Sequence, residues 1–135
     1  MKRSISLSIG VLIVLGIAFA FYSESYSKPN KVRFASLTVN HKILNVGDSP
    51  QRIENRAIFV IRNSGNTLLE ISDITADCHC TVPTWNKQPI APGDSTYLSV
   101  IYDNHKLGLF QQKITVTSNA IESPTLLVMR GRVIE

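Results

Sequence analysis

The sequence predicts an all-β protein, an antiparallel β-sandwich of about seven strands preceded by an N-terminal hydrophobic helix. Three observations predict this fold. After residue 22, apolar and polar residues alternate with a period of two, which is typical of strands that bury one face. Clusters of turn residues separate these alternating runs at short intervals. No segment after residue 22 shows a helical period. A single small β-barrel is the alternative fold.

The N-terminal segment is the most apolar part of the chain. Two basic residues precede a run at residues 5–22 that contains no charged side chain, and these 18 residues are near the lower limit for a spanning helix. One interpretation of residues 1–22 is a transmembrane anchor. The other is a signal peptide cleaved near Ala20, because Ala18 and Ala20 supply the small residues of an A-x-A site. Either way we expect an exported protein, periplasmic or otherwise extracytoplasmic, that is membrane-anchored through residues 5–22 or secreted.

Charge restricts the classes of partner. The formal net charge is +4, and without residues 1–20 there are 12 basic and 10 acidic residues, a net charge of +2. Because this excess is small and the basic residues are scattered, we expect no nucleic-acid binding. Residues 23–33 are mostly polar and contain one proline, which predicts a tether ahead of a folded domain at residues 34–135.

The strands are predicted from their alternation. In chain order the predicted runs are VRFASLTV (32–39), HKILNV (41–46), RIENRAIFVIR (52–62), TLLEISDIT (67–75), TYLSVIYD (96–103), LFQQKITVTS (109–118) and TLLVMRGRV (125–133). We expect the core to contain Phe59, Ile61, Ile71, Leu98, Val100, Ile114 and Val116. Ile53, Ala57, Tyr102, Phe110, Leu127, Met129 and Val133 lie on the same apolar faces. The alternation slips at Ser72 and Asp73, which predicts a bulge.

Two turns are recognisable from composition. The sequence NSGN (63–66) predicts a turn, because asparagine and glycine tolerate positive φ. In IAPGDS (90–95), Pro92 fits the second position of a β-turn and Gly93 the third, where φ is positive. About seven strands in roughly 100 residues fit an Ig-like sandwich best, although the Cys…Trp…Cys spacing of antibody domains is missing.

The only two cysteines, Cys78 and Cys80, flank His79 in the sequence DCHCTVP. Since an exported protein meets an oxidising compartment, we expect a local disulfide. A bridge over three residues gains only about 1.6 kcal/mol from loop entropy, so the fold is expected to be independent of it. Two other roles stay open. The cysteines are candidates for a thiol-redox pair, or for two thiolate ligands of copper or zinc.

The remaining candidate functional residues give weaker indications of a function. Trp85 is a candidate binding residue, or else a side chain that covers the edge of the core. The sequence contains no nucleophile-elbow motif, phosphate-binding glycine loop or H-E-x-x-H motif. We therefore expect no enzymatic activity and no cofactor. The predicted function is a non-catalytic interaction or structural module of the cell envelope with an unknown protein partner. The alternative is thiol-redox or copper handling through Cys78 and Cys80.

A series of short motifs runs through residues 59–119: an N-x-G turn, C-x-C-T followed by a proline and an aromatic residue, P-I-x-P-G, Y-D, G-x-F and S-N. It comprises Asn63, Gly65, Cys78, Cys80, Thr81, Pro83, Trp85, Pro89, Ile90, Pro92, Gly93, Tyr102, Asp103, Gly108, Phe110, Ser118 and Asn119. In order and spacing the series resembles the bacterial family called domain of unknown function 1573, over about residues 34–133. The resemblance implies an Ig-like sandwich akin to Hydin-type domains, usually exported or envelope-associated. It implies no activity.

Overall fold

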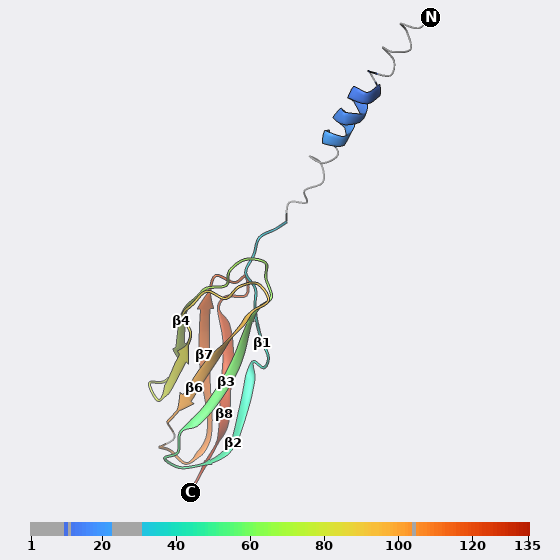
Figure 1. Ribbon diagram of the computed structural model, residues 1–135. Coiled ribbons are helices and arrows are strands. Elements are labelled where there is room, and N and C mark those ends of the chain that lie inside the picture. Colours follow the sequence, from blue (N-terminus) through green and yellow to red (C-terminus); the bar gives the residue numbers. More distant parts are fainter. Residues whose placement is uncertain (1–9, 11, 23–30, 104) are drawn as a thin grey trace, which may run out of the picture. The chain divides into compact units, whose positions relative to one another are not determined.

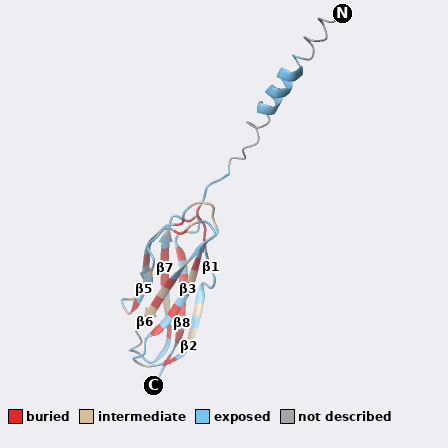
Figure 2. Ribbon diagram, viewed as in Figure 1, coloured by how far each residue is buried: buried red, intermediate tan, exposed pale blue. Residues whose placement is uncertain are grey.

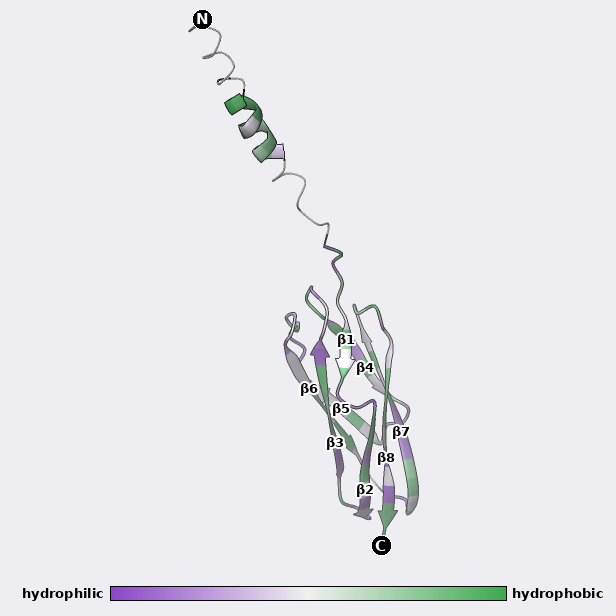
Figure 3. Cartoon of the chain, turned by 90° about the vertical axis from the view of Figure 1, so that its right-hand side faces the viewer, coloured by the Kyte–Doolittle hydropathy of each residue, from purple (hydrophilic) through white to green (hydrophobic). Residues whose placement is uncertain are grey.

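The computed structural model describes residues 10, 12–22, 31–103 and 105–135. The chain divides into two compact units, Met1–Val32 and Arg33–Glu135 (Figure 1). In the first unit, residues 12–22 are helical and mostly hydrophobic (Figure 3). Among the described residues, no helix has the length and hydropathy needed to cross a membrane. The prediction of an anchor or signal peptide also involves residues 1–9 and 11, and the predicted tether involves residues 23–30, all of which lie outside the described residues.

The second unit is a sandwich of two four-stranded sheets (Figure 1). One sheet has the order β1-β3-β6-β5 and the other the order β2-β8-β7-β4. The strands are β1 (Leu37–Val39), β2 (Ile43–Pro50), β3 (Asn55–Asn63), β4 (Ile71–Ala76), β5 (Thr81–Trp85), β6 (Ser95–Tyr102), β7 (Gly108–Ser118) and β8 (Thr125–Ile134). The prediction of an all-β, Ig-like sandwich is confirmed.

Two features of the sheets differ from the expectation. The sequence predicted about seven strands, whereas the described residues form eight; the additional one is β5, which contains Pro83. Because β5 is at the edge of its sheet, a proline without an N–H group is tolerated there. The second difference is the pair β2 and β8, which is parallel, while the other pairs are antiparallel.

The core lies between the sheets. Buried and exposed residues alternate along β3 and β8 (Figure 2), so the inner face of each strand packs into the core. Of the predicted core residues, those with no solvent exposure are Phe59, Ile61, Leu98, Val100, Ile114 and Val116. Ile71 is only half-buried, because it sits at the register shift between Ile71 and Asp73, which is the predicted bulge. Ile53 was predicted to face inward but is 53% exposed, since it lies in the turn before β3.

The NSGN turn forms for a different reason from the one expected. Among the described residues, only Arg52, Gly47, Gly93 and Gly108 have positive φ, so the turn at residues 63–66 does not need this conformation. At Gly93 φ is +87°, as the P-G turn required.

The turn at residues 63–66 depends instead on the Asn63 side chain, which is fully buried. Its Nδ2 donates to the carbonyl oxygens of Thr67 (2.7 Å) and Ile90 (2.9 Å). Its Oδ1 accepts from the N–H of Gly65 (2.9 Å). Asn63 therefore ties its own turn to the loop that precedes β6.

Candidate functional site

The cysteine loop connects the two sheets, because it follows β4 of one sheet and precedes β5 of the other. The structure joins Cys78 and Cys80 by a disulfide, with their Cα atoms 5.2 Å apart. Both residues are half-buried, whereas His79 between them is exposed. The pair therefore lies at the surface, in a loop between the sheets.

Backbone hydrogen bonds fix this loop independently of the bridge. The N–H of Asp77 donates to the carbonyl oxygen of Lys113 on β7 (3.1 Å). The N–H of Asp103, just after β6, donates to the carbonyl oxygen of Cys80 (2.9 Å). Within the loop, the N–H of Thr81 donates to the carbonyl oxygen of Cys78 (3.2 Å). Both sheets thus hold the loop through main-chain contacts.

No group of three or more histidine, cysteine, aspartate or glutamate side chains is placed to hold a metal ion, within the ranges that the structure describes. His105 instead lies against Asp103, with 2.8 Å between Nε2 and Oδ2, and both side chains are largely exposed. A structural zinc site needs four ligands. In the described ranges, no third histidine, cysteine, aspartate or glutamate side chain joins Cys78 and Cys80 in such a group.

Trp85 lies at the end of β5, half-buried, and packs against the core. It is opposite Leu98 of β6 in the sheet register. The Nζ atom of Lys87 is 5.7 Å from the centre of the indole ring, within the range of a cation–π interaction. The Nε1 atom is buried and has no hydrogen-bond partner among the described atoms. The ring thus covers the edge of the core, and a binding role for it stays a prediction.

A second surface was not identified from the sequence. On the outer side of the first sheet, Ile58 is 52% exposed, Val82 56% and Tyr97 69%. The half-buried Val60 is opposite Tyr97, and the half-buried Ile101 is opposite Val82 on one side and Arg56 on the other. These five apolar residues, here called the β3–β6–β5 face, lie around Ser99, which is opposite both Ile58 and Thr84. In the sequence, this face is indicated by the unbroken apolar run at residues 57–61, which departs from the strict alternation of apolar and polar residues.

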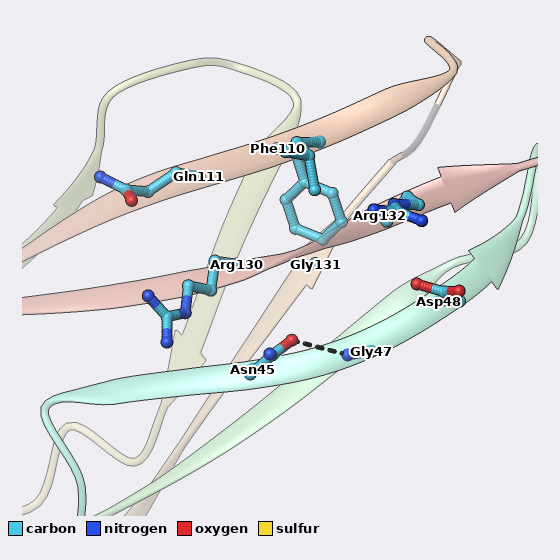
Figure 4. A pocket seen from close by; sticks show the side chains of 9 residues that line it. Asn45, Gly47, Asp48, Phe110, Gln111, Arg130, Gly131 and Arg132 are labelled. Atoms are coloured by element: carbon cyan, nitrogen blue, oxygen red, sulfur yellow. Dashed lines mark hydrogen bonds between the residues drawn. The ribbon is translucent and has the colours of Figure 1, made fainter.

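The outer side of the second sheet carries a groove of about 600 Å³. It lies where the register of β2 shifts between Asn45 and Asp48, beside Arg130 and Arg132 of β8 (Figure 4). Asn45 Oδ1 accepts from the N–H of Gly47 (3.0 Å), which closes the bulge (Figure 4). Neither arginine forms an ion pair with a described residue. Guanidinium groups of this kind can bind carboxylates, but Asp48 in the same groove offsets part of their charge.

The two packed four-stranded sheets give the chain the fold of an Ig-like β-sandwich domain. It belongs to the family described as Protein of unknown function (DUF1573), whose model matches residues 37–133. The predicted resemblance is thereby confirmed. The description of this family names no catalytic activity. No curated protein matches the chain.

Solved structures share the fold at low sequence identity. A protein of unknown function from Porphyromonas gingivalis W83 matches with a TM-score of 0.66 and 17% identity, over 79% of this chain and 50% of its own. This chain therefore spans about half the length of that protein. The ASH / PapD-like domain 7 of human CEP192 matches with a TM-score of 0.63 and 11% identity, over 80% of this chain and 92% of that domain.

A third similar structure, the VesB protease of Vibrio cholerae, has a TM-score of 0.59 and 15% identity. The match covers 74% of this chain but only 32% of the protease. At such identities the likeness shows the fold alone.

Proposed function

We propose that this protein is an exported, non-catalytic interaction module of the cell envelope, which binds a partner protein through the β3–β6–β5 face. The observation that carries the proposal is the grouping of five exposed or half-buried apolar residues on the outer side of three neighbouring strands. Single exposed apolar residues are ordinary, but contiguous apolar patches are typical of interaction sites. Tyr97 is the most exposed of the five and is of a residue type enriched at interface centres.

The surroundings of the face indicate the chemistry of the partner. Arg56 and Arg62 are exposed at the two ends of the β3 segment that carries Ile58 and Val60. An apolar centre with a polar, solvent-accessible rim is the usual arrangement of a protein interface. We therefore expect a partner surface that is apolar at its centre and acidic at its edge.

The face is a better candidate than the adjacent sheet edge. Edge strands can accept an added strand through their free backbone groups. However, Pro83 in the middle of β5 removes one N–H donor from this edge. Side-chain contacts across the face are therefore the proposed mode of binding.

Export is supported by the sequence. The uncharged run at residues 5–22 is typical of a membrane anchor or a signal peptide. Attachment through residues 5–22 and release after cleavage near Ala20 both put the sandwich outside the cytoplasm. The β3–β6–β5 face would meet its partner there.

A pair of matched variants tests the proposal. Ile58→Lys changes the β3–β6–β5 face, and Leu126→Lys changes the outer side of the other sheet at a similar exposure, 52% against 49%. Both exposed positions should leave the unfolding midpoint almost unchanged. The measurement is the size of the native assembly that contains the full chain, extracted from expressing cells in mild detergent.

We expect the wild type and Leu126→Lys to migrate in one larger assembly and Ile58→Lys to migrate as the chain alone. Co-migration of Ile58→Lys with the wild type would contradict binding through this face. Loss of the assembly in both variants would also contradict it, because the effect would not be specific to one sheet.

A further inference from the structure

The two sulfur atoms of the cysteine loop lie in different environments. The hydroxyl oxygen of Thr81 is 3.5 Å from Cys78 Sγ. Because a disulfide sulfur has no hydrogen, the hydroxyl is the donor of this contact. The side chain of Cys80 packs instead against the apolar core. On reduction, the Thr81 hydroxyl would stabilise a thiolate at Cys78, whereas the apolar contacts of Cys80 would favour the neutral thiol.

The loop should keep its shape when the bridge opens. Its main-chain hydrogen bonds to Lys113 and Asp103 do not involve the sulfur atoms. Thr81 is itself buried, with 4% exposure, and its N–H binds the carbonyl oxygen of Cys78. The donor and the sulfur are thus held together by the backbone. Since a three-residue loop gains little stability from its bridge, reduction and oxidation need not unfold the domain.

From these contacts we propose that Cys78 and Cys80 form a thiol–disulfide exchange site, in which Cys78 is the attacking cysteine and Cys80 the resolving one. The substrate class is an exposed protein disulfide in the same compartment. This activity goes beyond the proposed interaction role and does not depend on the β3–β6–β5 face.

The exchange proceeds in two balanced steps. The Cys78 thiolate attacks one sulfur of the substrate disulfide, a mixed disulfide forms, and the other substrate sulfur leaves as a thiolate. The Cys80 thiol then loses its proton and attacks Cys78 Sγ, which restores the internal bridge and releases the second substrate thiolate. The cysteine pair is oxidised by two electrons and the substrate is reduced by two. A protein dithiol in the same compartment must then reduce the pair again.

Alkylation tests the assigned roles. The full chain is reduced with dithiothreitol, freed of reductant and treated briefly with iodoacetamide across a pH series, and each cysteine is quantified by mass spectrometry. We expect Cys78 to react faster than Cys80 at neutral pH. Thr81→Val should slow Cys78 about tenfold at this pH, because it removes a hydrogen bond to a charged group. Thr81→Ser should restore the rate, and Thr84→Val, at an exposed position of the same strand, should not change it.

A second measurement does not require a change in buried Thr81. Oxidised glutathione is added to the reduced Cys80→Ser and Cys78→Ser variants, and the mixed disulfides are followed by mass spectrometry. We expect Cys80→Ser, which retains Cys78, to form its adduct several-fold faster. Equal rates in the two variants, or a faster reaction at Cys80, would overturn the proposal. Loss of cooperative unfolding when the wild type is reduced would also overturn it, because the bridge would then be structural.

Discussion

Replacing Asn63 by alanine should strongly destabilise the sandwich. The change removes three hydrogen bonds from a side chain that has no solvent exposure. The carbonyl oxygen of Ile90 stays paired, because it also accepts the N–H of Leu69 (2.9 Å). The N–H of Gly65 and the carbonyl oxygen of Thr67 lose the Asn63 side chain as a partner.

The magnitude follows from these bonds. Each is worth about 1 kcal/mol net, and leaving a partly buried group unpaired adds about 1 kcal/mol or more. The expected loss is therefore about 3–5 kcal/mol, a large part of the roughly 5–15 kcal/mol that stabilises a typical domain. With a urea dependence of about 1–2 kcal/mol/M, a loss of 4 kcal/mol lowers the midpoint by about 2–4 M.

The assay is equilibrium unfolding in urea, followed by the fluorescence of the single tryptophan, Trp85. The matched control is Asn119→Ala. Asn119 also makes two side-chain bonds to the backbone, from Glu70 N–H (2.9 Å) and to the carbonyl oxygen of Leu68 (3.0 Å), but it is exposed. Water can replace these bonds, so the control should lose less than about 1 kcal/mol. Equal losses of unfolding free energy in the two variants would refute the conclusion that the buried hydrogen bonds of Asn63 stabilise the fold.

Three further predictions concern the fold. Phe59→Ala should cost about 3–5 kcal/mol in the same urea assay, because Phe59 has no exposure; a loss below about 1 kcal/mol would contradict its central position. Gly65→Ala should also lower the urea midpoint, since its Cβ would lie 2.5 Å from Phe34 O; an unchanged midpoint would mean that the backbone there shifts easily. The hydrogen bond from Ser36 lowers the pKa of Glu122, so this carboxylate stabilises the fold above its ordinary pKa of 4.5 and ceases to do so as the pH falls through the lowered pKa. Thermal unfolding from pH 6 to pH 3 should show this acid-dependent loss in the wild type and a smaller one in Glu122→Gln; identical curves would contradict it.

Alternation predicted the strands with one strictly apolar side. In β7, Phe110, Ile114 and Val116 are buried and the residues between them are more exposed, so the period of two was sufficient. β5 was missed because its five residues contain a proline and follow directly on the cysteine loop. The parallel pairing of β2 with β8 brings together distant parts of the chain, and local patterns carry no information about such pairing.

The candidate sites were only partly predictable, because local sequence patterns do not give the pairing of strands or the turns of the chain. The C-x-C motif is local, so Cys78 and Cys80 were found directly. The contact of Thr81 with Cys78 depends on how the chain turns, and spacing alone does not give it. The β3–β6–β5 face arises from cross-strand pairs such as Val60 with Tyr97, which requires the sheet register.

The most direct test of the interaction role is site-specific photo-crosslinking in cells that express the full chain. A photoreactive phenylalanine analogue is placed at Tyr97, on the β3–β6–β5 face, or at Leu126, on the outer side of the opposite sheet. We predict one discrete protein adduct from position 97, none of the same size from position 126, and loss of the adduct when Ile58→Lys is added. An absence of any adduct at position 97, or the same adduct from both positions, would contradict binding through this face.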